Sequence, residues 1–154
     1  MGDELSVTVR RERGIVVAEV TGDMDVSTAA GLRERLFGLA ESGQPLIVDL
    51  NRITFIDSAG LGVLVGVARR ADEHGGSLHA VCSRAQTRKL LWLTGVDRRI
   101  PLTATVDGAL TLLRASRDAP RLGAASGLAR AQRCSDRAAR ARPASGCGQR
   151  TRLA

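Results

Sequence analysis

Aromatic residues are almost absent from this sequence. Phe37, Phe55 and Trp92 are the only three among 154 residues, and there is no tyrosine. Apolar residues nevertheless make up 44% of the chain, so a hydrophobic core can form, and it must be built from aliphatic side chains. Proteins that bind single-stranded nucleic acid stack the bases on aromatic rings. The scarcity of rings therefore argues against that mode of binding.

Cysteine and long apolar runs are also scarce. The three cysteines, Cys82, Cys134 and Cys147, form no C-x-x-C pair, and no histidine lies near the last two to complete a zinc site. Sparse, unpaired cysteines fit a reducing compartment. The N-terminal residues lack the apolar stretch of a signal peptide, and no run of 18 apolar residues could span a membrane. We therefore expect a cytoplasmic protein without a membrane anchor, a metal or a cofactor.

The positive charge of the chain is confined to its last 40 residues. Residues 1–114 hold 14 basic and 14 acidic side chains, whereas residues 115–154 hold nine arginines and two aspartates. The neutral segment offers no electrostatic support for nucleic-acid binding. The basic segment has too few large apolar residues to offset the entropy of ordering. We therefore expect one folded domain over 1–114 and a disordered tail over 115–154.

The hydrophobic pattern of residues 1–114 alternates between strands and helices. We expect strands over 6–10, 15–20, 46–50, 78–82 and 100–102, helices over 28–40, 58–74, 84–93 and 106–114, and a loop over 21–25. The first two strands form an antiparallel hairpin, and strands separated by helices form parallel pairs. The sequence thus predicts an α/β fold with a mixed, mostly parallel sheet flanked by about four helices.

Ser58 is the residue on which the function depends, because it lies at the start of an apolar helix and next to Asp57. It can be a helix cap, a nucleophile or a phosphate acceptor. A nucleophile needs a base, but His74 lies about 24 Å further along the helix, and nothing in the sequence brings His79 near. The first glycine of the hydrolase motif G-x-S-x-G is also missing. We therefore expect no catalytic residue and no enzymatic activity.

The cap and phosphate-acceptor interpretations of Ser58 both remain open. A serine N-cap stabilises a helix by about 1 kcal/mol, but it does not explain Gly60 and Gly62. These glycines either pack tightly against the sheet or leave the helix start bare for a partner. A phosphate on Ser58 would be tolerated at a helix N-terminus and would add a charge of about −1.5 to −2 beside Asp57.

Several segments, taken in order, resemble a known family. They are Gly22-Asp23-Met24-Asp25, the strand over 46–50, the run FIDSAGLG over 55–62 and the run LLWLTG over 90–95. From about Val7 to Leu113 the chain resembles bacterial anti-sigma factor antagonists, which are single STAS domains. The resemblance implies a sheet of four to five strands flanked by helices. The arginine-rich tail has no counterpart in that family; it could dock on an acidic partner or nucleic acid, or have no role.

The resemblance also implies a mechanism. Ser58 matches the family's phosphorylated serine, and the kinase would be an anti-sigma factor with an ATP-binding fold. The unphosphorylated protein would bind that kinase and release the sigma factor, phosphorylation would switch binding off, and a phosphatase would reset it. The residues expected to meet the partner are Asp23, Asp25, Asp57, Ser58, Ala59, Gly60 and Gly62.

Two of the polar residues in this region have a second interpretation. Asp25 is equally well explained as an acid that stabilises the start of the first helix, and Thr54 is a weaker candidate phosphate acceptor. An alternative function is also open: a STAS module in another stress-signalling scaffold, or a small-ligand sensor. A third is nucleic-acid binding through the tail.

Overall fold

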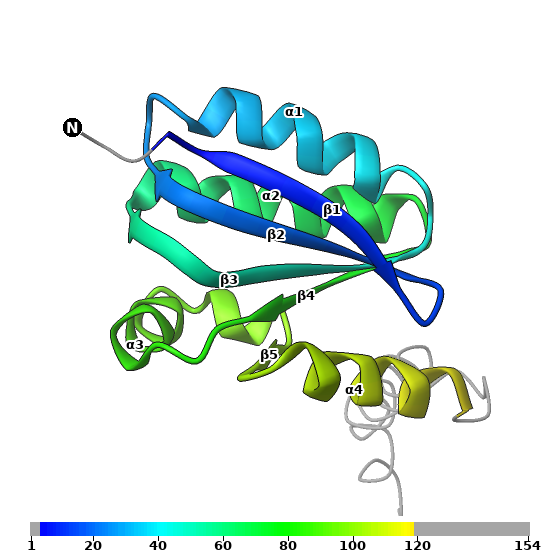
Figure 1. Ribbon diagram of the computed structural model, residues 1–154. Helices are drawn as coiled ribbons and strands as arrows, with labels where there is room; N and C mark the ends of the chain where they lie inside the picture. The colour runs from blue at the N-terminus through cyan, green and yellow to red at the C-terminus, as the bar shows by residue number, and fades with distance from the viewer. Residues whose placement is uncertain (1–3, 119–154) are drawn as a thin grey trace, which may run out of the picture. The chain divides into compact units, whose positions relative to one another are not determined.

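The computed structural model describes residues 4–118, which fold into a sheet and helices in the predicted order (Figure 1). One short 3₁₀ helix, η1, is additional. The elements are β1 (Ser6–Glu12), β2 (Ile15–Met24), α1 (Ala29–Ala40), β3 (Pro45–Ile56), α2 (Ser58–Glu73), β4 (Ser77–Val81), α3 (Ala85–Leu93), η1 (Val96–Arg98), β5 (Leu102–Thr103) and α4 (Val106–Asp118).

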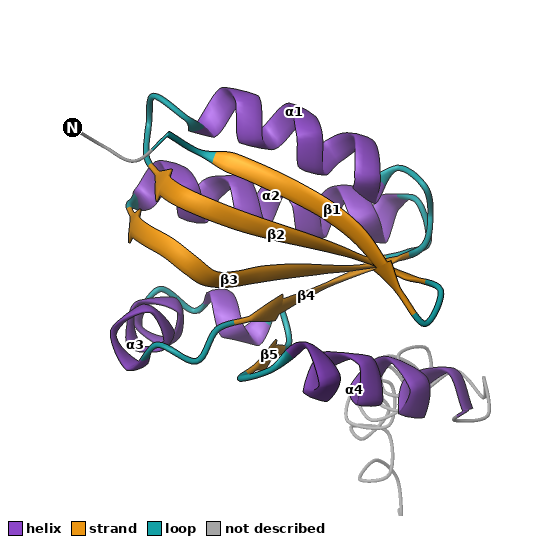
Figure 2. Ribbon diagram, viewed as in Figure 1, coloured by secondary structure: helices purple, strands orange, loops and turns teal. Residues whose placement is uncertain are grey.

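The five strands form one sheet in the order β1-β2-β3-β4-β5 (Figure 2). Strand β1 pairs with β2 in the antiparallel sense, and the other three pairs are parallel. The expected mixed, mostly parallel sheet is therefore confirmed. Because the parallel strands all run in one direction, the starts of the helices that follow them meet at one edge of the sheet.

The two faces of the sheet bury different helices, because successive side chains of a strand point to opposite faces. In β2, Val16, Ala18 and Val20 belong to one core, and Ile15 and Val17 belong to another. Helices α1, α2 and α3 cover the first face, and α4 covers the second (Figure 1).

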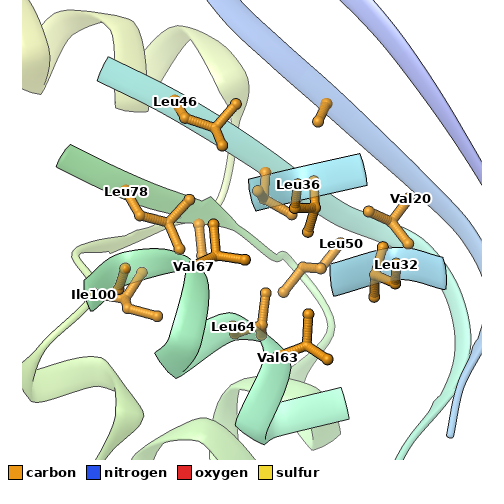
Figure 3. Packing of buried hydrophobic residues seen from close by; sticks show 14 of the residues in the cluster. Val20, Leu32, Leu36, Leu46, Leu50, Val63, Leu64, Val67, Leu78 and Ile100 are labelled. Carbon is orange, nitrogen blue, oxygen red and sulfur yellow. The ribbon is translucent and has the colours of Figure 1, made fainter. Parts of the chain in front are cut away.

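The larger core is aliphatic, as the composition predicts. Side chains from α1 and α2 interlock with the strands, and Ile100 closes one end (Figure 3). No aromatic side chain is among the buried core residues of the described range. The residues labelled in the figure are Val20, Leu32, Leu36, Leu46, Leu50, Val63, Leu64, Val67, Leu78 and Ile100.

Strands β2 and β3 are longer than the sequence indicates. The loop expected over 21–25 is wrong for its first four residues, because Thr21–Met24 continues β2. The polar segment after residue 50 likewise continues β3 to Ile56. The two extensions pair with each other, Asp23 with Phe55 and Met24 with Ile56, after two register shifts. In β2 this long-range pairing holds Gly22 and Asp23 in an extended form that local propensity does not favour, whereas residues 53–56 have strand propensity of their own.

Other boundaries also differ from the expectation. Helix α4 continues to Asp118, past the helix end expected at residue 114. Residues 119–154, most of the segment expected to be disordered, lie outside the described range. In α3 Leu91 is buried, whereas Leu93 is exposed. None of the helices within residues 4–118 combines the length and the apolar character needed to cross a membrane.

His79 is a buried polar residue on the side of the sheet that α4 covers. It pairs with Ile47 across β3 and β4 and is only 7% exposed. Its Nδ1 atom has no hydrogen-bond partner among the described residues. Burial lowers the pKa of the imidazole below its ordinary value. The unfolded chain therefore binds a proton on this residue at a higher pH than the folded chain does.

This difference predicts that the protein loses stability in mild acid. The free energy of unfolding should fall as the pH drops below about 6.5, at no more than about 1.4 kcal/mol per pH unit from this residue. Urea unfolding at about pH 7.5 and about pH 5.5 measures it, and His79→Leu should remove most of the dependence. His74→Gln is the matched control because His74 is exposed; an equal loss in both variants would contradict the prediction.

Candidate functional site

The candidate site lies where β2 and β3 end and α1 and α2 begin. The two strand ends are tied together, because the Asp57 backbone N–H donates to the Met24 carbonyl at 3.1 Å. Helix α2 starts immediately afterwards, at Ser58. The chain thus turns from strand to helix beside the neighbouring strand end. This places Asp23 at the end of β2, Asp25 just after it and the serine of α2 in one region.

Asp57 is the N-cap of α2, and the interpretation of Ser58 as the cap is wrong. Asp57 has the extended backbone of a cap residue, and its Oδ1 accepts hydrogen bonds from the N–H groups of Ala59 at 2.8 Å and Gly60 at 3.1 Å. Aspartate and serine are both strong caps, so local sequence alone does not choose between neighbours. The choice follows from β3 continuing to Ile56, which leaves Asp57 as the residue between strand and helix.

This cap leaves the Ser58 hydroxyl available. Ser58 is exposed, and its Oγ makes no hydrogen bond to another residue within 4–118. The helix N-terminus is less open to an anion than the sequence indicates, because two of its backbone N–H groups already donate to the Asp57 carboxylate. A phosphate on Ser58 would therefore lie next to a carboxylate that already accepts these N–H groups. It would not find the free N–H donors of an anion-binding helix start.

Asp23 and Thr54 are joined across the extended ends of β2 and β3. The Thr54 hydroxyl donates to Asp23 Oδ1, although both residues were expected in loop or link segments. Both side chains lie at the same sheet edge as Asp57. Asp23 is therefore fixed at the end of β2 by Thr54, and the Thr54 hydroxyl is engaged within the protein.

Asp25 shapes the turn that leads into α1. Its Oδ1 accepts hydrogen bonds from the Ser27 hydroxyl at 2.6 Å, from the Ser27 N–H at 2.9 Å and from the Thr28 N–H at 3.1 Å. The hydroxyl of Ser27 and these backbone groups lower the pKa of the Asp25 carboxyl. The helix-start interpretation of Asp25 is therefore supported. Thr28 is the residue that precedes α1, so the helix begins one residue later than the start expected at 28.

Gly60 and Gly62 have different roles. A Cβ atom on Gly60 would lie 2.6 Å from the Met24 carbonyl oxygen and 2.9 Å from Met24 Cβ, so Gly60 allows α2 to pack closely on β2. Gly60 is buried and does not offer the bare surface expected of it. Gly62 is exposed, and a Cβ there would meet nothing within 4 Å. Tight packing thus explains the first glycine, and an open surface explains the second.

Two large apolar side chains near the ends of β2 and β3 are exposed at the surface. Val26 is 78% exposed in the turn before α1, and Phe55 is 54% exposed near the end of β3. Val26 lies between Asp25 and Ser27, and Phe55 follows the polar residues Asn51 and Arg52, so neither belongs to the apolar runs from which the core is predicted. Their exposure therefore places apolar surface near the ends of β2 and β3.

The two histidines lie away from Ser58. His74 caps the opposite end of α2, where its Nδ1 is 2.9 Å from the Arg70 carbonyl oxygen. His79 is buried under the other face of the sheet. Among residues 4–118 no group of three or more histidine, cysteine, aspartate or glutamate side chains is arranged to hold a metal ion.

Fold and site together define an α/β domain in which an exposed serine directly follows the N-cap of a helix. The model of the STAS domain family matches residues 6–109 of this chain, and the chain therefore belongs to that family.

Curated relatives share most of this length. The anti-sigma-B factor antagonist of Bacillus subtilis strain 168 is 32% identical over 106 residues, which cover 69% of this chain and 97% of that protein. The anti-sigma-F factor antagonist RsfB of Mycobacterium tuberculosis H37Rv is 30% identical over 116 residues, which cover 75% of this chain and 94% of that protein. Both alignments cover almost the whole of the relative, and the residues left unaligned are mostly those of this chain.

A solved structure agrees with these relatives. The crystal structure of an anti-sigma factor antagonist from Mycobacterium paratuberculosis superposes with a TM-score of 0.67 at 29% identity, covering 72% of this chain and 95% of that one. The predicted STAS fold is therefore confirmed.

The capping geometry predicts unequal effects of two neighbouring substitutions. Asp57→Ala should lower the free energy of unfolding by about 1 kcal/mol, because two helical N–H groups lose their acceptor. Ser58→Ala should change it by less than about 0.5 kcal/mol, because an exposed hydroxyl is removed. Urea unfolding of the two variants measures both values. The reverse order would mean that Ser58 is the cap.

The two glycines give a second matched pair. Gly60→Ala should destabilise the protein by about 1–3 kcal/mol, because its Cβ would be forced against the Met24 backbone. Gly62→Ala should stabilise it by up to about 1 kcal/mol, because alanine favours the helix and meets no neighbour. Thermal unfolding distinguishes them, and similar effects at both positions would contradict this assignment.

Proposed function

We propose that this protein is an anti-sigma factor antagonist that is switched by phosphorylation of Ser58. The unphosphorylated form binds an anti-sigma factor and so releases a sigma factor, and the phosphorylated form does not bind. The observation that carries the proposal is the exposed Ser58 hydroxyl next to the Asp57 cap, in a chain whose relatives are named as antagonists of anti-sigma factors. This role requires a cytoplasmic protein.

The surface around Ser58 supports binding to another protein. Val26 and Phe55 are exposed on either side of the α2 start, and Gly62 adds no side chain to it. Apolar side chains of this size contribute binding energy when a partner removes them from water. Asp23 adds a charged group held by Thr54. An apolar surface beside fixed polar groups is the usual composition of a protein interface.

The charge at the start of α2 supports a switch. A phosphate adds about −1.5 to −2 charge on the residue next to the Asp57 carboxylate. Because that carboxylate already accepts the Ala59 and Gly60 N–H groups, the phosphate would stay hydrated and repelled. A partner that covers Ser58 would have to remove this water, which is costly for an uncompensated charge. Binding is thus lost without any refolding of the domain.

The phosphoryl group must come from an enzyme other than this protein. In our proposal the anti-sigma factor is the kinase: the γ-phosphorus of ATP forms a bond to Ser58 Oγ, the bond to ADP breaks, and a base of the kinase takes the hydroxyl proton. A separate phosphatase hydrolyses the phosphoserine. Neither His74 nor His79 lies near Ser58 to act as that base.

The experiment uses the full chain and each anti-sigma factor encoded in the same genome. Incubation with ATP should add one phosphate, measured by mass spectrometry, and Ser58→Ala should abolish it. Thr54→Val is the matched control, because it removes a neighbouring hydroxyl and should leave the single phosphate in place. Phosphorylation that persists in Ser58→Ala would refute the assignment of the site.

Binding is measured on the same proteins by calorimetry. Ser58→Asp should weaken the affinity for the anti-sigma factor at least about tenfold, because it adds a charge next to Asp57. Ser58→Asn is a neutral side chain of similar size and should weaken it much less. Equal affinities of Ser58→Asp and Ser58→Asn would contradict an electrostatic switch.

A further inference from the structure

An open groove runs between α1 and α2 and reaches Ala59, the residue that follows Ser58. Its cavity volume is about 550 Å³, within the range of about 300–1,000 Å³ that is typical of binding pockets. Figure 1 shows the two helices that form its walls on the same side of the sheet. Small and apolar residues make up most of the lining: Val26, Ala29, Ala30 and Phe37 on one side and Ala59 and Gly62 on the other.

The groove exists because the spacing of the two helices changes along α2. At Gly66 the helices are close, and a Cβ atom would lie 3.5 Å from the Phe37 ring. One turn earlier, at Gly62, a Cβ atom would meet nothing within 4 Å. The Phe37 ring therefore closes the groove at one end, and the small side chains leave it open toward Ser58.

The closed end is held in place by charged groups. The guanidinium groups of Arg33 and Arg70 lie 5.7 and 5.9 Å from the centre of the Phe37 ring, within the range of a cation–π contact. Arg70 also pairs with Glu41 at 2.7 Å. These contacts keep the ring in position, so the groove is already formed before any partner arrives.

We infer that this groove receives apolar side chains from a helix of the anti-sigma factor. The inference rests on the proposed function, because it assigns part of the same binding surface. Ala59 and Gly62 lie in the first two turns of the helix that Ser58 begins, so a partner that covers Ser58 continues into the groove. A space between two helices is well matched by the side-chain ridge of a third.

The charges at the groove also favour an apolar occupant. Arg33 and Glu34 are the two charged residues among its lining residues, and their charges are opposite. A lining with no net charge gives no preference for an anion or a cation, whereas its alanines and Phe37 favour apolar surface. The groove thus supplies affinity, and a phosphate on Ser58 at its open end blocks entry.

The test fills the groove without altering Ser58. In Gly62→Leu a large side chain occupies the space where a Cβ meets nothing, and the affinity of the full chain for the purified anti-sigma factor should fall at least about tenfold. Gly38→Leu is the matched control: Gly38 is also an exposed helical glycine with open space around it, but it does not line the groove. It should change the affinity by less than about twofold.

The outcomes separate this inference from the function on which it rests. If the wild type binds the anti-sigma factor and Gly62→Leu binds equally well, the groove is not used and the proposed function stands. If no anti-sigma factor binds the wild type, both are refuted. If sedimentation shows a wild-type dimer that Gly62→Leu dissociates, the occupant is a second copy of this chain and the inference is overturned. Thermal unfolding confirms that each variant is folded.

Discussion

The hydrogen bonds from the Ala59 and Gly60 N–H groups to the Asp57 carboxylate are the interaction on which the site depends. They cap α2, which begins at Ser58, so the serine hydroxyl is not needed as the cap. They also occupy the donors that would otherwise neutralise an anion at this helix end. If Ser58 were itself the cap, its hydroxyl would be directed to the helix, and a phosphate there would both remove the cap and change the surface.

The position of this capped start is fixed by the packing around it. Gly60 lets α2 approach the Met24 backbone, and the Asp57 N–H donates to the same Met24 carbonyl that a larger residue at 60 would meet. The end of β2 and the start of α2 are therefore held together by both a hydrogen bond and close packing. A charge added at Ser58 acts on a rigid surface, so its effect falls on binding and not on the conformation of the domain.

The sequence predicted the order of elements, because apolar periodicity and glycine breaks are local signals. It did not predict that Thr21–Met24 is strand, because Gly22 and Asp23 favour turns and are extended through pairing with β3. It missed the end of β3 because Asn51 and Arg52 interrupt the apolar run. It could not decide whether Gly60 and Gly62 pack tightly or leave the surface bare, because a glycine's neighbours are set by tertiary packing.

In the function we propose, binding and switching are divided between adjacent features of the surface. The α1–α2 groove and the exposed Val26 and Phe55 bury apolar area, whose contribution depends little on salt. Ser58 and Asp57 contribute charge, which matters most when a partner excludes water from it. A phosphate at the groove's open end therefore opposes an interface that remains otherwise intact. Phosphorylation of Ser58 can then abolish binding while the apolar surface is unchanged, so removal of the phosphate restores binding.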